Sequence, residues 1–363
     1  MKTENRKITI DDVARALNIS KTTVSRAISG KGRVGEKTRN MVMEYIKENN
    51  YRPNPMAKGL AESRTYNIAV VWPADYDYMD LPFFQRCVVG MNKVTSANDM
   101  DILICMTRGE DIGELARIVE NKKADGVILT RTLIEDPAAD YLISRGFPFV
   151  SIGSSANDEI ITVDNNNFEA CRELTAILAT QKTKKLALLG GDPNHVITHT
   201  RYKGFEAGLK QAGAKVNEKL VNLGVNTERR VSELLNEYMK LGAECIICMD
   251  DMLCDMLIRC CRNEGVDIPG DLRIASFYDS KLLANSDPPI TSLHFDDFMI
   301  GQRAAEMILR LTNGDEVEKE VIDVTSIANT LIDLEVNRIT NYRNINKMSA
   351  KVNRKFILKS STK

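Results

Sequence analysis

The feature that most restricts the fold is an alternation of short apolar runs with helical stretches that starts at Tyr66. Seven runs have the length and composition of buried strands, and stretches such as 83–98 and 168–181 between them have helical periodicity. This alternation is typical of parallel sheets covered by helices on both faces. We therefore predict an α/β architecture for the larger part of the chain. The runs are NIAVVW, DILIC, ADGVILT, FPFVSIG, KLALLG, ECIICM and RIASFY.

The segment before this alternation, Ile10–Ile28, has the pattern of two short helices joined by a tight turn. Thr9 followed three residues later by Asp12 predicts a capping box. Asn18 can adopt the left-handed conformation that leaves the first helix, and Ser20 can cap the second. The expected inward faces are Ile10, Val13, Ala14 and Leu17 in the first helix and Val24, Ala27 and Ile28 in the second.

The second helix would turn hydrogen-bonding and basic side chains outward, an arrangement that suits a DNA major groove. The alternative is an ordinary helical hairpin whose polar face meets water. A third helix is predicted over 36–49, with an inward face of Met41, Val42, Tyr45 and Ile46. Lys31 and Arg33 in the preceding loop would suit phosphate contacts, unless the loop is simply solvated. The candidate DNA-contacting residues of the second helix are Lys21, Thr22, Thr23, Ser25 and Arg26.

Charge is distributed unevenly along the chain. Residues 1–62 contain 13 Lys and Arg against 7 Asp and Glu, and residues 338–363 contain 8 basic and no acidic residues. Because the whole chain has a net charge of −1, the residues between them carry a net negative charge. A basic head on an acidic body indicates that the head alone meets a polyanion. No apolar run approaches the ~20 residues of a membrane span, and the N-terminus has no apolar signal core, so we expect a cytoplasmic protein.

Residues 52–63 have the pattern of a conditional helix. Asn54 can cap it and Pro55 suits its first turn, but Gly59 costs about 1 kcal/mol relative to Ala. So short a helix is far below the ~12–15 residues that an isolated helix needs. We expect it to form only when it docks, with Leu60 as an apolar wedge for a DNA minor groove. A plain linker is the alternative.

The sequence contains no convincing metal-binding or catalytic motif. Cys245 and Cys248 lie three apart on a predicted strand, so they point to opposite faces, and free buried thiols in a reducing compartment explain the eight cysteines better. His195 and His199 lie in a stretch that enters a helix, without the Glu of a metalloprotease motif. The sequence has no phosphate-binding loop motif and no catalytic constellation that can be singled out. We expect no cofactor, no metal and no enzyme activity.

Residues 8–62 resemble, almost without interruption, the DNA-binding head and hinge of the LacI/GalR family of bacterial transcriptional repressors. The resemblance rests on TIDDVARALNISKTTVSRAISG and GEKTRNMVMEYIKENNYRPNPMAKGL. It implies base reading by Lys21, Thr22 and Arg26, minor-groove insertion by Leu60, and packing of Ala57 between paired hinges.

Residues 66–337 resemble the periplasmic-binding-protein-like core of the same family. The resemblance implies two α/β lobes with a small-molecule effector in the cleft between them and a homodimer interface along the lobes. The markers are LPFF (81–84), VDNNN (163–167), RYKGFEAGL (201–209), NEGVDIPGDLRIASFYDS (263–280) and PPITSLHFDDFMIGQRAAEMIL (288–309).

The implied pocket departs from the sugar-binding pattern of the family. Arg201 matches the arginine that commonly clasps a ligand oxygen, whereas Met249 stands where the family often has Asn, Tyr278 where it has an Asp, and Ser154 where it frequently has an Arg. Aromatic side chains could stack on a sugar face or could simply belong to the core. A carbohydrate-related effector is the expectation. The candidate effector-binding residues are Phe83, Ser154, Arg201, Met249, Tyr278 and Phe295.

The sequence therefore predicts a small all-α helix-turn-helix DNA-binding domain plus an α/β two-lobed periplasmic-binding-protein-like core. We expect a homodimeric, sequence-specific repressor of a carbohydrate-utilisation operon that binds a pseudo-palindromic operator and responds allosterically to a sugar or sugar derivative. Inducer and corepressor roles both stay open. A transport-associated binding protein of the same fold would have an export signal and no basic head. The predicted parts are the head (1–50), the hinge helix and linker (51–65), the core (66–337) and a basic, disordered tail (338–363).

Overall fold

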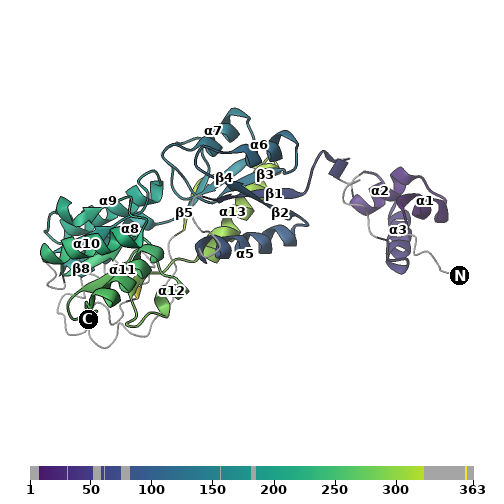
Figure 1. Cartoon of the computed structure of the whole chain (residues 1–363). Helices are drawn as coiled ribbons and strands as arrows, with labels where there is room; N and C mark the ends of the chain where they lie inside the picture. Colours follow the sequence, from purple (N-terminus) through teal and green to yellow (C-terminus); the bar gives the residue numbers. More distant parts are fainter. Residues whose placement is uncertain are drawn as a thin grey trace. The chain divides into compact units, whose positions relative to one another are not determined.

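The computed structural model divides into two compact units, Met1–Tyr66 and Asn67–Lys363, which are described separately (Figure 1). Lys31, Asn54 and Ala57, and all of the tail 338–363 except two residues, lie outside the described residues. The described residues are 8–30, 32–51, 59–60, 62–74, 82–155, 157–180, 185–322 and 356–357.

The described part of the first unit forms three short helices around one small core. Val13, Val24 and Val42, one from each helix, are fully buried. Met41 differs from the prediction because 39% of it is exposed. It lies about 100° around the helix from Val42, which already faces the other helices, so Met41 is left at the edge of the core. The helices are α1 (Ile10–Ala16), α2 (Lys21–Ser29) and α3 (Glu36–Glu48).

The predicted helix caps are confirmed. The Thr9 hydroxyl accepts from the Asp12 backbone N–H, and the Asp12 carboxylate accepts from the Thr9 backbone N–H at 2.9 Å, which completes the capping box. The Ser20 hydroxyl accepts from the backbone N–H of Thr23 at 3.1 Å. Asn18 has φ of 50°, the left-handed conformation expected at the end of the first helix. Local sequence therefore fixes both ends of the turn between α1 and α2.

Within the described residues, the second unit contains two six-stranded sheets. The first has the strand order β11-β5-β4-β3-β1-β2, and the second has the order β12-β10-β9-β8-β6-β7. All neighbouring strands run parallel except β12 and β10, which are antiparallel. The first sheet contains β1 (Asn67–Pro73), β2 (Asp101–Thr107), β3 (Gly126–Leu129), β4 (Phe149–Ile152), β5 (Thr162–Asn165) and β11 (Glu320–Ile322). The second contains β6 (Leu186–Leu189), β7 (Val221–Asn222), β8 (Cys245–Cys248), β9 (Arg273–Ser276), β10 (Thr291–Leu293) and β12 (Phe356–Ile357).

Helices cover both faces of each sheet, as the strand–helix alternation predicts (Figure 1). The predicted helices at 83–98 and 168–181 are confirmed, and each begins one residue earlier than expected. The first sheet is covered by α5 (Pro82–Ala97) and α13 (Asp297–Thr312), and by α6 (Gly113–Glu120) and α7 (Pro137–Ser144). The second is covered by α8 (Asn167–Thr180) and α9 (Val196–Gln211), and by α10 (Glu228–Lys240) and α11 (Asp251–Glu264). Two short helices also lie between strands of the second sheet in the chain, η2 (Glu218–Leu220) and α12 (Lys281–Ala284).

Two crossovers between the sheets lie within the described residues. It leaves the first sheet after β5 and enters α8, which packs on α9, and it returns from β10 to α13, which packs on β3, β4 and β5. The backbone N–H of Asn166, in the first crossover, donates to the carbonyl of Ile322 at the end of β11 at 3.3 Å. Both crossovers follow the carboxyl ends of strands, which is where ligands bind in folds of this kind.

All eight cysteines are buried free thiols, as predicted from their spacing. Burial raises the pKa of Cys245 and of Cys261 to about 12, so these thiols stay protonated and unreactive. Among the described residues, no group of three or more His, Cys, Asp or Glu side chains could hold a metal ion. The described helices include none that is long and apolar enough to cross a membrane.

The expected disordered tail differs from the structure at two residues. Phe356 and Ile357 form β12, which pairs antiparallel with Leu293 and Ser292 of β10. Without this pairing β10 would be an edge strand with unpaired backbone groups. The other residues of 338–363 lie outside the described residues.

Candidate functional sites

The outward face of α2 carries the candidate base-reading residues. Lys21, Thr22, Ser25 and Arg26 are exposed. Thr23 is half-buried, and its hydroxyl shares a hydrogen bond of 2.8 Å with that of Ser20, so it belongs to the helix cap. The exposed residues cover the first turns of α2, where an approaching major groove would meet them.

The charges on this face are available to an incoming polyanion. Lys21 forms an ion pair with Asp11, and both side chains are largely exposed. Exposed ion pairs contribute about 0–1 kcal/mol, so a phosphate group could replace Asp11 at little cost. Arg33, in the loop before α3, is exposed as well.

The described part of the hinge presents one large apolar side chain. Leu60 is 86% exposed, in a segment where Gly59, Leu60 and Glu62 are helical. A Cβ at Gly59 would lie 2.4 Å from the carbonyl oxygen of Arg64, whose backbone N–H donates to Gly59 at 2.9 Å. Gly59 therefore lets the backbone of Arg64 approach closely. Its low helix propensity alone predicts only that it destabilises the hinge helix.

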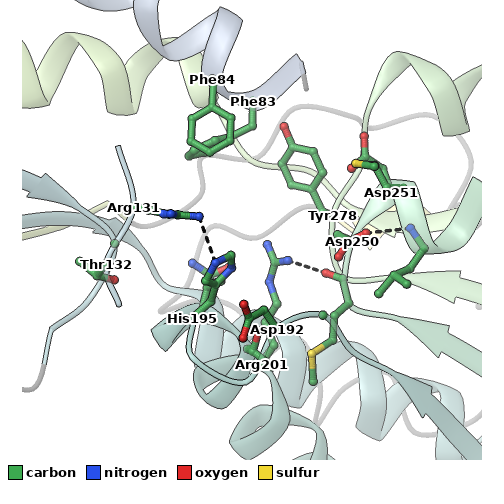
Figure 2. A pocket seen from close by; sticks show the side chains of 18 of the residues that line it. Phe83, Phe84, Arg131, Thr132, Asp192, His195, Arg201, Asp250, Asp251 and Tyr278 are labelled. Atoms are coloured by element: carbon green, nitrogen blue, oxygen red, sulfur yellow. Dashed lines mark hydrogen bonds between the residues drawn. The ribbon is translucent and has the colours of Figure 1, made fainter. Parts of the chain in front are cut away.

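A cavity of about 260 Å³ lies in the second unit at the carboxyl ends of strands from both sheets. Residues that follow β1, β3 and β5 line it from the first sheet, and residues that follow β6, β8 and β9 line it from the second (Figure 2). Ser154 does not line the cavity; its backbone N–H donates to the carboxylate of Asp164 at 2.9 Å. The structure brings five of the six candidate effector-binding residues together in the lining: Phe83, Arg201, Met249, Tyr278 and Phe295.

Stacked aromatic rings form one wall of the cavity. Tyr278 and Phe295 are stacked, with centroids 6.5 Å apart and ring planes at 12°, and Phe83 meets Tyr278 edge-on at 6.2 Å. Tyr278 and Phe295 are only 6% and 3% exposed. The two alternatives for these rings, packing in the core and lining the pocket, therefore both apply. They belong to the core of the second sheet, and their remaining surface faces the cavity. The Tyr278 hydroxyl donates to Asp297 at 2.6 Å.

A second wall carries carboxylates around one arginine. Burial raises the pKa of Asp164 and of Asp250 to about 6, and the nearby Arg201 guanidinium opposes the shift in both. Asp250 caps α11 by accepting from the backbone N–H of Leu253 at 2.8 Å. Arg201 donates to the carbonyl oxygen of Met249 (Figure 2). The pocket thus holds two buried carboxyl groups whose pKa lies above the ordinary value for Asp.

Sequence interpretation missed several polar residues of the lining. Each directly follows a strand or opens the helix after it, so counting residues from the carboxyl end of each predicted strand would have found them. They are Arg131 after β3, Asn167 at the start of α8, Asp192 and His195 between β6 and α9, and Asp251 at the start of α11.

The segment 131–135 after β3 contacts the segment 192–196 after β6. We call this contact between the two segments the rim bridge. Leu133 and His195 form an antiparallel bridge, and the backbone N–H of Ile134 donates to the Asn194 carbonyl at 2.8 Å. Arg131 Nη1 donates to His195 Nε2 at 3.2 Å, which requires that nitrogen to be unprotonated (Figure 2). The rim bridge joins the two sheets at the edge of the pocket.

A basic three-helix head together with a two-sheet α/β core is typical of DNA-binding transcription regulators. Residues 65–335 match the family model "Periplasmic binding proteins and sugar binding domain of LacI family", and residues 9–54 match "Bacterial regulatory proteins, lacI family". The chain belongs to the LacI family and is a DNA-binding transcriptional regulator.

Curated relatives match nearly the whole chain. The regulator MalR of Streptococcus pneumoniae is 28% identical over 334 residues, which are 90% of this chain and 99% of MalR. Catabolite control protein A of Staphylococcus xylosus is 27% identical over 315 residues, 86% of this chain and 94% of that protein.

Solved structures share the fold. A complex of the regulator CelR with cellobiose has a TM-score of 0.68 at 22% identity and covers 98% of this chain and 100% of its own. The lac repressor dimer bound to operator and the anti-inducer ONPF has a TM-score of 0.73 at 17% identity, with 98% and 99% covered. At these identities the similarity shows the fold alone.

Proposed function

We propose that the protein represses a carbohydrate-utilisation operon, that it binds a pseudo-palindromic operator as a homodimer, and that a small sugar or sugar derivative in the pocket controls this binding. The observation that carries the proposal is the 260 Å³ cavity lined from both sheets beside the crossovers. A ligand there touches both sheets at once, so it can bind one relative arrangement of them more tightly than another. Only that difference in affinity can change operator occupancy.

The names of similar proteins support a sugar as the effector. One similar structure is a complex of CelR with cellobiose, another is titled a probable maltose operon transcriptional repressor, and one curated relative is named catabolite control protein A. Arg201 and the pocket carboxylates supply donors and acceptors for hydroxyl groups, and the aromatic wall supplies an apolar surface for a ring face.

Exposed apolar side chains support the homodimer. Ile104 and Met106, on the outer strand β2, are 48% and 47% exposed, and Val89 on the neighbouring helix α5 is 60% exposed. Apolar residues on an unpaired edge strand are a liability that an interface removes. A second copy of the chain would cover them and would also bring a second head to a symmetric operator.

Footprinting of DNA upstream of the gene that encodes the chain tests the proposal. We expect protection of a two-fold symmetric site, and a five- to 150-fold change in affinity with one sugar of a panel containing maltose, cellobiose and glucose. Weaker binding with the sugar would identify an inducer, and tighter binding would identify a corepressor. No preference for any upstream fragment over random DNA at moderate salt would contradict the proposal.

Two variants separate the two sites. Leu60→Ala should weaken specific DNA binding and leave sugar binding unchanged, because its side chain is an exposed apolar group in the hinge. Tyr278→Phe should change the sugar response and leave sugar-free DNA affinity unchanged, because Tyr278 lines the pocket and the variant removes its hydroxyl, which donates to Asp297. Equal effects of both variants on both measurements would contradict these assignments.

A further inference from the structure

The charges that line the pocket are not balanced. Among the described residues, four carboxylates and two guanidinium groups line the cavity. A ligand in the cavity therefore meets more negative than positive charge. The charged residues are Asp164, Asp192, Asp250 and Asp251, and Arg131 and Arg201.

Both guanidinium groups donate hydrogen bonds within the protein, and of their nitrogens the buried Arg201 Nε has no hydrogen-bond partner among the described residues. Arg201 donates to the Met249 carbonyl, and its charge opposes the burial-driven rise in the pKa of Asp164, Asp250 and Asp251. Arg131 donates to His195 in the rim bridge. An anionic ligand that drew Arg201 away would leave the buried carboxylates without that compensation, which is costly.

Two buried acceptors in the lining lack donors. Asp251 Oδ2 and Asn167 Oδ1 have no hydrogen-bond partner among the described residues, and each residue is only 4% exposed. The amide nitrogen of Asn167 is already used, since it donates to Asp164 at 3.2 Å. Unsatisfied buried acceptors are stabilised by groups that donate hydrogen bonds. Hydroxyl and ammonium groups donate, whereas ionised phosphates and carboxylates principally accept.

The size of the cavity restricts the ligand further. Its volume of about 260 Å³ lies just below the ~300–1,000 Å³ of pockets for drug-sized ligands. A ligand of one sugar ring fits this volume better than a longer oligosaccharide.

We infer that the pocket takes a monosaccharide-sized effector rich in hydrogen-bond donors and without negative charge, and that it rejects phosphorylated and acidic sugars. The inference rests on the proposed sugar effector and specifies its charge. Asp251 and Asn167 accept from its donor groups, and the excess of carboxylates repels an anion.

The fluorescence of Trp72 provides the measurement. Trp72 is the single tryptophan of the chain, and its ring lies 5.7 Å from that of Phe84, which lines the cavity. The full-length protein is titrated with glucose, glucosamine, glucose 6-phosphate and glucuronate, and with the galactose counterparts of all four. In each set we expect the neutral or amine-bearing sugar to bind at least about tenfold more tightly than both anionic sugars.

A charge-removing variant tests the cause. Asp251→Asn keeps the shape of the side chain and removes one negative charge, so it should narrow the difference between glucose and glucose 6-phosphate. Asp315→Asn removes a charge from an exposed residue outside the lining and should leave that difference unchanged.

The outcomes separate the inference from the proposed function. Tighter binding of an anionic sugar than of its neutral parent would overturn the inference and leave the sugar effector standing. An equal effect of Asp251→Asn and Asp315→Asn would overturn the role of the pocket carboxylate. Binding of maltose or cellobiose but of none of the eight monosaccharides would overturn the inference and leave the sugar effector standing. Binding of none of these ten sugars would overturn both.

Discussion

The head and the pocket are encoded in different ways. The helix caps and buried core of the head lie within residues 9–51, and each cap joins residues three apart. The pocket lining runs from Pro73 to Ile300 and draws on both sheets. The comparison teaches that a short stretch of sequence can specify the helices of the head, whereas the pocket exists only after strands distant in sequence have paired.

The two regions also bury different chemistry. In the described residues of the head, the buried side chains are all apolar or aromatic. The second unit buries carboxylates, among them Asp164, Asp251 and Asp297, and burial raises the pKa of each. Stability in the head therefore depends on a few apolar contacts, and the pocket carries groups that reduce stability and are suited to binding.

The largest expected effect is a loss of stability in the head that leaves the pocket unchanged. Val24 is fully buried in a core of few residues, so Val24→Ala should destabilise the head by about 3 kcal/mol through lost burial and a cavity. Calorimetry should show the transition of the head at a lower temperature, and Trp72 fluorescence should report unchanged sugar binding. An equal shift of a single transition for the whole chain would contradict the independence of the two units.

The next prediction sharpens the role of α2. Arg26 is exposed on this helix, and the resemblance to the family gives it a base-reading role. Arg26→Ala should reduce discrimination between operator and mutated operator by about 1–3 kcal/mol, the value of one good base contact. Competition binding assays measure this discrimination. Arg145→Ala, which removes an exposed arginine from the second unit, is the control. Unchanged discrimination with weaker overall binding would assign Arg26 to the phosphate backbone.

A third prediction uses pH to test the pocket. The pKa of Asp250 rises from 3.8 to about 6 on folding, so the folded state takes up the proton first as pH falls. The group lowers stability at pH 7, and this loss is relieved between about pH 6 and pH 4. Asp250→Asn retains a capping side chain for α11 and removes the buried charge. It should stabilise the second unit by about 1–2 kcal/mol at pH 7.5.

The same variant should give almost no gain near pH 4, because the wild-type carboxyl is then protonated in the folded protein. Thermal unfolding at both pH values measures the difference. A gain that does not change with pH would show that the buried charge is not its cause.

Sequence predicted the local features and missed the long-range ones. The caps at Thr9 and Ser20 and the left-handed Asn18 follow from side-chain chemistry within three residues, and all are confirmed. Five of six pocket candidates reach the lining because family motifs place them. Asp251 and His195 belong to no motif, and only their positions after the predicted strands β8 and β6 could have identified them. That they line one pocket depends on strands that are distant in sequence ending side by side.

The smallest expected effect concerns the rim bridge, where the pocket depends on contacts between two distant segments. Arg131→Ala removes the hydrogen bond to His195, one of several that join the segments, and should weaken the bridge by about 1 kcal/mol. A bound sugar should then leave about fivefold faster, as measured by stopped-flow Trp72 fluorescence.

Arg131 also lines the pocket, so a faster release could reflect a lost ligand contact. A double-mutant cycle with His195→Ala separates the two causes. If Arg131 acts through His195, the double variant releases sugar no faster than either single variant, because both remove the same bond. Additive effects would mean that Arg131 touches the ligand directly, and the rim bridge would then be a consequence of sheet packing that does not control access to the pocket.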